Sequence, residues 1–311
     1  SLSMVRMRPF RSAPFDPADF PTNRFVLDCC GRRLDCRPGA PAMHGAHVMG
    51  ILNTTPDSFS DGGQHLAVEA AVSRTAEMLS EGATIVDIGG ESTRPDADPV
   101  DLQTELDRVI PVIEAIQKQF PDALLSIDTY KPAVARTALD AGAHIVNDVT
   151  GLRLFPETAA VAAQAGAPLI AMHSVNAPGA LTEPGAYDDV TDAVQEGMQE
   201  AIDTATDAGV QHVVTDPGFG FGKTVTENLR LLNRVGRLLA LERPVLVGIS
   251  RKSTIGAVLG TTARPRPVDD RLFGSLGATA VAVLRGATLV RTHDVAATVD
   301  MLRTLGATLR A

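Results

Sequence analysis

Cysteine, tryptophan and aromatic residues are scarce in this chain. It has 3 cysteines, no tryptophan, and an aromatic content of 4% in 311 residues. Cys29, Cys30 and Cys36 lie together near the N-terminus without CxxC spacing or histidine partners, so they do not predict a zinc site, and we interpret them as reduced structural thiols. No HExxH motif or histidine-rich cluster is present, which argues against a tightly held transition metal.

Long apolar runs and an excess of positive charge are missing as well. No segment approaches the length of a membrane span, and the basic start soon meets Pro9 and Pro14 without the apolar core of a signal peptide. We therefore expect a cytoplasmic protein with no membrane partner. The formal net charge of -9 argues against a nucleic-acid partner, although a local basic pocket would still bind small anions.

The hydrophobic content of 44% and the charged content of 21% are typical of a globular protein with a sizeable core. Residues 1–24 are rich in proline, arginine and aspartate and predict a loosely ordered N-terminal arm, in which residues 1–3 are treated as a remnant of cloning. Residues 25–311 are expected to form a single domain. Within it, residues 25–36 flank Gly31 and predict a β-hairpin ahead of the main fold.

One unit recurs from Val48 onward: a short apolar strand, a polar strand end and an amphipathic helical stretch. The predicted strands are residues 48–52, 84–88, 124–127, 144–146, 168–172, 212–215, 245–249 and 288–290. The predicted helical stretches are residues 68–80, 102–120, 134–141, 157–165, 193–208, 228–241, 272–284 and 295–305. Glycines at 82, 142, 166, 209 and 286 follow helices, where a left-handed cap would end them. Eight such units predict a (β/α)8 TIM barrel; a doubly wound open sheet is the alternative, but no GxGxxG follows a strand.

The carboxyl ends of the barrel strands carry most of the notable polar groups, and functional groups in a TIM barrel lie at these ends. The ends are Asn53, GGESTRP (89–95), Asp128 with Lys131, Asn147 with Asp148, His173, DPGFGFGKT (216–224), SRKS (250–253) and RTHD (291–294). Convergence of so many polar groups on one rim predicts a catalytic mouth, although any one of these residues alone is as well explained by a cap or a structural hydrogen bond.

The groups on this rim divide into acceptors and cations. Asp128, Asn147 and Asp216 suit a flat heterocycle that presents several N–H donors. Arg291 and His293 precede a helix whose free N–H groups would share an anion with them. DPGFGFGKT is not a phosphate loop, because Pro217 stands where GxxxxGK[ST] requires glycine.

Three further chemistries are open at this point. Lys252 is a candidate for a Schiff base with a carbonyl substrate. Asn53 and Asp61 predict an oxygen-rich Mg²⁺ site completed by substrate phosphates. Ser250 and Ser253 bracket two cations at a helix start that would accept a carboxylate.

Taken together, the motifs MGILNTTPDSFSDGG, DIGGESTRP, SIDTYKP, NDVTG, DPGFGFGKT, GISRKS and VRTHDV resemble those of the dihydropteroate synthase family, in order, from Val48 to Asp294. The resemblance implies a transferase of folate biosynthesis. Such an enzyme condenses 6-hydroxymethyl-7,8-dihydropterin diphosphate with 4-aminobenzoate, gives 7,8-dihydropteroate and diphosphate, and is a target of sulfonamides. A Mg²⁺ cofactor and a homodimer are implied by the resemblance too.

The family's functional residues are expected at matching positions of this chain. The pterin pocket would consist of Asp128, Asn147, Met172, Asp216, Lys252 and Arg291. The diphosphate contacts would be Asn53, Arg291 and His293, with Mg²⁺ at Asn53 and Asp61. The 4-aminobenzoate pocket would consist of Phe59, Thr93, Arg94, Pro95, Phe221 and Ser253. Catalysis is expected to depend on Asn53, Asp128, Asp216, Lys252, Arg291 and His293.

The implied mechanism is loss of diphosphate from the pterin methylene, followed by attack of the neutral arylamine, so Lys252 becomes a binding group instead of a Schiff base. The loop from Thr54 to Gly63, with Phe59, is expected to close over the diphosphate. One departure is the sequence after Met172 and His173, where Ser174 to Tyr187 differs from the family's usual loop. This departure is the only support for one alternative, a catalytically silent pterin-binding paralogue. A second alternative is a methyltetrahydrofolate-type methyltransferase barrel, against which Phe59, GGESTRP and SRKS weigh.

Overall fold

The computed structural model describes residues 15–40, 45–54, 63–92, 99–175 and 187–311. A 3-10 helix, η1 (Pro17–Asp19), and a short helix, α1 (Thr22–Phe25), lead into a hairpin of β1 (Val26–Cys29) and β2 (Arg32–Asp35). The hairpin prediction is confirmed. Residues 15–24, expected in the irregular arm, instead form helical turns, because Asp16 accepts a hydrogen bond from the Ala18 N–H and Phe25 is buried. The rest of the arm lies outside the described residues.

Eight parallel strands form the barrel, as the sequence predicts. They are β3 (His47–Asn53), β4 (Ile85–Gly89), β5 (Leu124–Asp128), β6 (Ile145–Asp148), β7 (Leu169–Met172), β8 (Val213–Asp216), β9 (Leu246–Gly248) and β10 (Leu289–Thr292). Their order is β8-β7-β6-β5-β4-β3-β10-β9, and a bridge between Thr215 and Val245 joins the two ends of the sheet. The TIM barrel is therefore confirmed.

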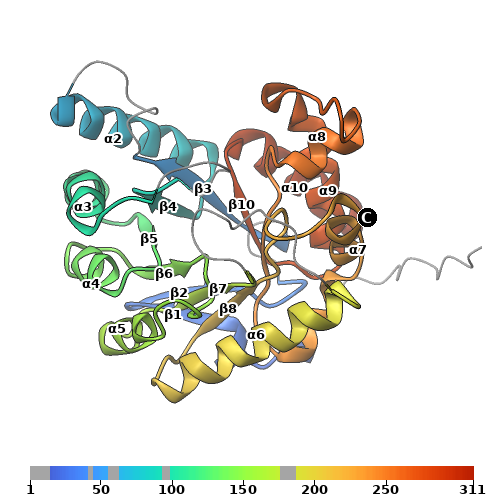
Figure 1. Ribbon diagram of the computed structural model, residues 1–311, viewed down its shortest axis with the longest axis horizontal. Coiled ribbons are helices and arrows are strands. Elements are labelled where there is room, and N and C mark those ends of the chain that lie inside the picture. Colours follow the sequence, from blue (N-terminus) through green and yellow to red (C-terminus); the bar gives the residue numbers. More distant parts are fainter. Residues whose placement is uncertain (1–14, 41–44, 55–62, 93–98, 176–186) are drawn as a thin grey trace, which may run out of the picture.

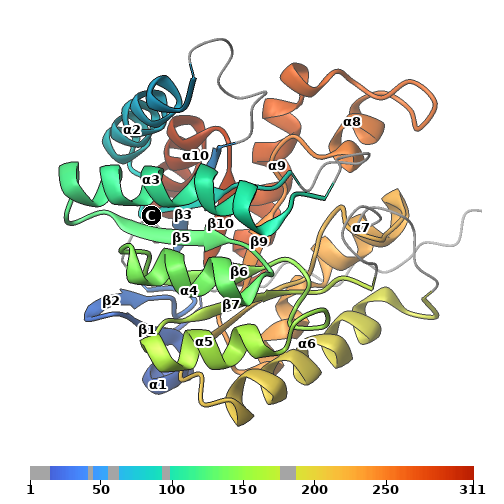
Figure 2. The same ribbon diagram turned by 60° about the vertical axis from the view of Figure 1, so that its left-hand side comes forward.

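Helices surround the strands in Figures 1 and 2. They are α2 (Gly63–Glu81), α3 (Leu102–Gln119), α4 (Pro132–Asp140), α5 (Glu157–Ala165), α6 (Val190–Asp207), α7 (Val225–Asn233), α8 (Ser253–Leu259), α9 (Leu272–Leu284) and α10 (Val295–Arg310), with 3-10 helices η4 (Val235–Leu241) and η5 (Val268–Arg271). The five glycines predicted at helix ends all have positive φ. No helix in the described ranges is both long enough and apolar enough to cross a bilayer.

One predicted helix is two elements. The stretch 228–241 is divided into α7 and the tighter η4 at Arg234, whose N–H is shared between the carbonyls of Arg230 and Leu231. Gly236, two residues further on, lies against the carbonyl oxygen of Arg285, and a Cβ at this position would come within 2.6 Å of that oxygen. Glycine is a poor helix former, so the break at this point has a local cause that the apolar periodicity hides.

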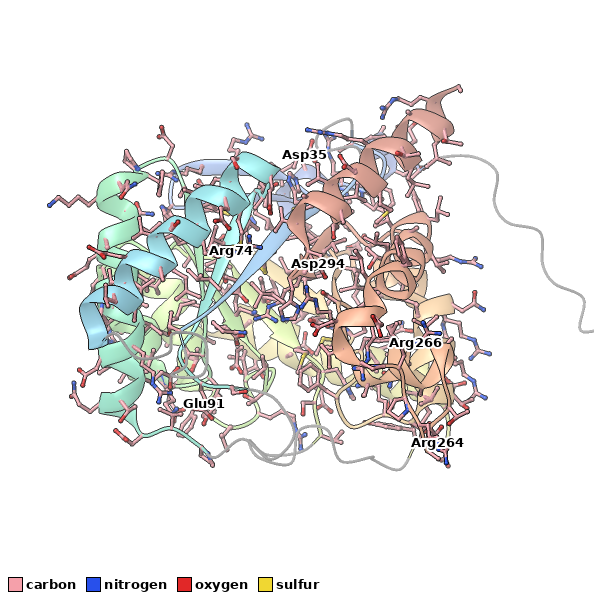
Figure 3. The ribbon with its side chains drawn as sticks, turned by 90° about the horizontal axis from the view of Figure 1, so that it is seen from above. Asp35, Arg74, Glu91, Arg264, Arg266 and Asp294 are labelled. Atoms are coloured by element: carbon pink, nitrogen blue, oxygen red, sulfur yellow. The ribbon has the colours of Figure 1, made fainter. Side chains whose placement is uncertain are left out.

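The half of the barrel interior toward the amino ends of the strands is apolar, and the hairpin closes it. Each strand contributes one large side chain to this layer: Met49, Ile85, Leu124, Ile145, Ile170, Val214, Leu246 and Leu289. Four side chains of the hairpin region, Leu27, Cys29, Leu34 and Cys36, pack beneath them. Figure 3 shows Asp35 of the hairpin at the opposite end of the molecule from Glu91, which follows β4. The hairpin therefore plugs the base, and the mouth lies at the carboxyl ends of the strands.

Candidate active site

Two residues beyond the apolar layer, the side chains of each strand again point into the barrel interior, because side chains along a strand alternate between its two faces. This layer holds Asp87, Ser126, Asn147, Met172, Asp216 and Arg291. This mostly polar layer lies directly above the apolar one and forms the floor of the mouth. The same alternation explains why Asn147 and Asp216, two of the predicted acceptors, line the same interior although they come from β6 and β8; Asp128 has the same orientation two residues above Ser126 on β5.

Arg291 is the centre of this floor. Its Nε donates to Asp87 Oδ2 at 2.6 Å and its Nη2 donates to Asp128 Oδ2 at 2.8 Å. Asn147 Nδ2 donates to the same Asp87 oxygen at 3.1 Å. Burial alone would lower the pKa of Arg291, but the two carboxylates outweigh it and raise the pKa. The guanidinium is therefore charged and oriented from two sides.

Asp128 stands at the same height as Asn53, with Gly89 between them on the intervening strand. Burial raises the pKa of Asp128 well above its usual range, Arg291 opposes that rise, and Asp87 adds to it. Asp128 thus sits where it can trade its hydrogen bond to Arg291 for one to an N–H donor of a bound ligand.

Asp216 and Lys252 form a second part of the site. The backbone N–H of Gly218 donates to Asp216 Oδ1 at 2.8 Å. Burial raises the pKa of Asp216 and lowers the pKa of Lys252 to about 7, and each residue's charge opposes the shift in the other. Lys252 Nζ donates to the Phe219 carbonyl, which places the Lys252 side chain beside the β8 loop.

An aromatic wall adjoins these charges. Lys252 Nζ lies 4.1 Å from the ring centre of Phe221, a cation–π contact. Phe221 packs with Met172, Tyr130 and Val149 in a small apolar cluster separate from the main core. A flat heterocycle bound over Met172 would have acceptors at its edge and apolar atoms at its face.

His293 is held by Ser250, which follows β9. Its backbone N–H donates to Ser250 Oγ at 3.2 Å, and Ser250 Oγ lies 3.1 Å from His293 Nδ1. His293 stands two residues before α10, whose N-terminal N–H groups favour an anion. The expected diphosphate pair of Arg291 and His293 therefore shares one side of the mouth.

Several predicted residues lie outside the described residues: Phe59, Asp61, Thr93, Arg94 and Pro95, together with most of the proposed lid and of the atypical segment after Ser174. Of the remaining aminobenzoate residues, Phe221 lies in the wall and Ser253 is the first residue of α8. Across the described ranges no group of three His, Cys, Asp or Glu side chains could hold a metal ion.

Asp87 escapes a reading of strand ends because it lies inside β4. Lys223 and Ser250 lie in strand-end motifs, but Lys223 was given no role and Ser250 was read only as an anion contact. Lys223 is buried and donates to the carbonyls of Gly218 and Phe221 at 3.0 and 2.8 Å, which fixes the loop that carries the aromatic wall. Alternation along β4 would have placed Asp87 inside the barrel, since it shares a face with Ile85.

The fold and the mouth define a class: a TIM-barrel enzyme with buried acceptors and cations that bind a polar heterocycle beside an anion. Residues 49–293 match the family described as pterin binding enzyme. The dihydropteroate synthase of Escherichia coli (strain K12) is 45% identical over 267 residues, which cover 85% of this chain and 92% of that protein. The chain therefore belongs to the pterin-binding enzyme family, among the dihydropteroate synthases.

Solved structures agree with this assignment. Dihydropteroate synthase of Xanthomonas albilineans with 4-aminobenzoic acid has a TM-score of 0.82 at 43% identity and covers 93% of this chain and 99% of its own. The same enzyme in complex with 7,8-dihydropteroate has a TM-score of 0.78 at 42% identity and covers 92% and 99%. Fold and sequence thus point to the same family over nearly the whole chain.

Proposed function

We propose that this chain is a dihydropteroate synthase that condenses 6-hydroxymethyl-7,8-dihydropterin diphosphate with 4-aminobenzoate and releases diphosphate. The observation that carries the proposal is the mouth of the barrel, where Arg291 joins Asp87 and Asp128 beside Asn147. These groups stand in a chain that shares 45% identity with a dihydropteroate synthase.

The pterin would lie over Met172, with its N–H edge toward Asp128, Asn147 and Asp216. Carboxylates accept hydrogen bonds only, and an amide both donates and accepts, which suits the mixed edge of a pterin. Lys252, with a pKa lowered to about 7, would donate to a ring acceptor when protonated. Arg291 would cover the ring while Asp87 keeps it oriented.

Aminobenzoate would bind beside the pterin methylene, with its ring against Phe221. Its carboxylate would approach Ser253 at the start of α8. Phe59, Thr93, Arg94 and Pro95 are assigned to the same pocket by the resemblance of their motifs. The arylamine must reach the methylene carbon uncharged, because only its free lone pair can form the C–N bond.

In the reaction the methylene C–O bond breaks and diphosphate leaves with the electron pair. The dihydropterin ring donates electrons to the resulting cation, the amine nitrogen attacks it, and the amine then loses a proton. Arg291, His293 and the N-terminus of α10 face the side on which negative charge grows, so they stabilise the transition state more than the ground state.

A Mg²⁺ ion fits this site only in a limited way. Asn53 ends β3 beside the mouth and offers one amide oxygen, and its expected co-ligand Asp61 lies outside the described residues. One or two protein oxygens suit an ion held mainly by substrate phosphates and water. Asn53 would hold such an ion, which when bound supplies charge neutralisation to the leaving diphosphate.

A homodimer is proposed from the family resemblance and from one exposed helix face. Phe273 on α9 is 84% exposed, and Gly277, one turn further on the same face, has open space around it. Val258 of α8 and Val268 of η5 are also exposed on neighbouring elements. A second copy of the chain would cover this apolar surface.

A cytoplasmic location is proposed as well, since Cys29, Cys30 and Cys36 are free thiols.

The test is incubation of the purified chain with the pterin diphosphate, 4-aminobenzoate and Mg²⁺, with diphosphate and dihydropteroate both measured. Product should form only with both substrates. The Asp216→Ala variant should form none, because pterin N–H donors would lose their buried partner. Pterin binding without turnover in the wild-type chain would instead identify a silent paralogue, and methyl transfer would identify the methyltransferase alternative.

A further inference from the structure

Two consecutive residues after β9 contact two consecutive residues after β10. Ser250 is hydrogen bonded to His293, as described above. Arg251, the next residue, makes a two-pronged ion pair with Asp294: Nε lies 3.0 Å from Oδ2 and Nη2 lies 2.5 Å from Oδ1. Planar guanidinium–carboxylate pairs of this kind fix both distance and orientation. The two loops are thus joined residue by residue.

The backbone of Arg251 is held in an unusual conformation. Its φ of 60° lies in the left-handed region, which is unfavourable for a residue other than glycine and persists only where neighbours enforce it. The Arg251 N–H donates to Ser275 Oγ at 3.0 Å, and Arg271 Nη1 donates to the Arg251 carbonyl at 2.8 Å. This turn directs the next side chain, Lys252, toward the Phe221 ring.

The other partner is fixed from a different element. Arg74 of α2 donates to the His293 carbonyl at 3.2 Å, and Figure 3 shows Arg74 near Asp294. The hydrogen bond from Arg251 chiefly lowers the pKa of Asp294, against the effect of burial, and the charge of Arg74 adds to that. Asp294 is therefore ionised at neutral pH. It lies between two cations, Arg251 in the loop after β9 and Arg74 on α2.

Each member of the ion pair adjoins a residue of the proposed reaction, since Arg251 precedes Lys252 and Asp294 follows His293. We propose that Arg251 and Asp294 are positioning residues, whose ion pair holds Lys252 and His293 at a fixed separation on the pterin and diphosphate sides of the mouth. This inference rests on the proposed function for the roles of Lys252 and His293. Neither Arg251 nor Asp294 is among the pterin, diphosphate or aminobenzoate contacts proposed above.

The test compares Asp294→Asn and Arg251→Gly with the wild-type chain. Glycine accepts the φ of 60°, so Arg251→Gly removes the ion pair without adding backbone strain. Each variant should lower kcat/KM for the pterin diphosphate by about 10- to 100-fold and weaken binding of inorganic diphosphate, with little change in thermal midpoint. Asp269→Asn is the matched control, because Asp269 lies 3.8 Å from the same arginine but is 94% exposed, and its kinetics should stay at the wild-type level.

A second background separates positioning from a general structural role. In a His293→Ala chain, adding Asp294→Asn should lower kcat/KM by a smaller factor than it does in the wild-type chain, since only Lys252 is left to position. An equal loss in both backgrounds, or wild-type kinetics in both ion-pair variants, would overturn the inference. A wild-type chain that forms no dihydropteroate would refute the proposed function alone, because the diphosphate-binding comparison would still test the ion pair.

Discussion

Arg291 illustrates why single charges in the barrel interior depend on one another. Its guanidinium is shared between Asp87, which is fully buried, and Asp128 at the rim. When a ligand donates to Asp128 in place of Arg291, the hydrogen bond from Arg291 to Asp87 can stay unchanged. Asp87 therefore keeps Arg291 in place through the binding step, and removing its charge should affect substrate binding even though it lies beneath the pocket.

Asp87→Asn tests this dependence. The variant keeps the side-chain shape but removes the charge opposite Arg291, and hydrogen bonds between charged groups contribute about 1.5–3 kcal/mol. We expect kcat/KM for the pterin diphosphate to fall by about 10- to 100-fold in steady-state assays. Asp140→Asn, on the exposed end of α4, is the control and should be unchanged. Equal kinetics in the two variants would contradict the role of Asp87.

The site residues that sequence could predict are those at strand ends. Asp128, Asn147, Asp216 and Arg291 meet because parallel strands bring their carboxyl ends to one rim. Asp87 was missed because it is not at an end and only its hydrogen bonds connect it to Arg291. The shifted pKa of Lys252 was beyond sequence too, since it depends on how much water the folded mouth excludes.

His173 gives a prediction about pH. Burial lowers the pKa of His173 to about 3, whereas the unfolded chain titrates near its usual 6.5. Between these values the unfolded state binds more protons, so stability present above pH 6.5 is lost as the pH falls. From pH 6.5 to 5 the wild-type chain should lose about 2 kcal/mol of unfolding free energy relative to His173→Asn.

Urea unfolding at several pH values measures this difference. His212→Asn is the comparison, because burial also lowers the pKa of His212 but that side chain is only partly buried. The pH-dependent difference in stability between wild type and His212→Asn should therefore be smaller than the difference between wild type and His173→Asn. Parallel pH curves for wild type and His173→Asn would mean that His173 is not kept neutral in the folded protein.

At the scale of elements, the hairpin and the mouth belong to opposite ends of one barrel. The apolar layer that the hairpin covers ends two residues below the polar floor, so packing and chemistry are separated along each strand. The two functions of the interior should accordingly be separable by mutation. A change in the hairpin should cost stability without altering the site.

Leu27→Ala in β1 makes that change. Leu27 is 1% exposed within the basal cluster, and truncating a buried leucine costs about 2–5 kcal/mol. The free energy of unfolding from urea titration should fall by that amount, while kcat at a temperature well below the new midpoint stays near wild type. Leu309→Ala, on an exposed part of α10, should change neither quantity. A specific loss of kcat would mean that the hairpin reaches the mouth.

The elements themselves were largely readable from sequence. Apolar runs of strand length and glycines after helices recur in the right order, and the predicted strands overlap all eight observed ones. The errors have local causes. Residues 15–24 are fixed by Asp16 and by burial of Phe25, and the helix 228–241 is interrupted at Arg234, where competing hydrogen bonds decide the outcome.

At the scale of the whole molecule, the exposed face of α9 requires an explanation that one copy of the chain does not offer. Phe273, the second residue of this helix, is 84% exposed, although the chain has few aromatic residues. Its neighbour along the face, Gly277, leaves room for a close approach by another backbone. Both features suit a symmetric contact, in which the same patch meets itself across a two-fold axis.

Phe273→Asp should therefore shift the chain from dimer to monomer in light scattering at micromolar concentration. A symmetric contact doubles the effect, because each dimer would bury two carboxylates without partners. Leu102→Asp on α3 is the control, since Leu102 is also exposed but lies across the barrel from α9 (Figure 1). It should leave the mass unchanged. If the wild-type chain is monomeric, or if the Phe273→Asp variant stays dimeric, the exposed face of α9 does not form the dimer contact.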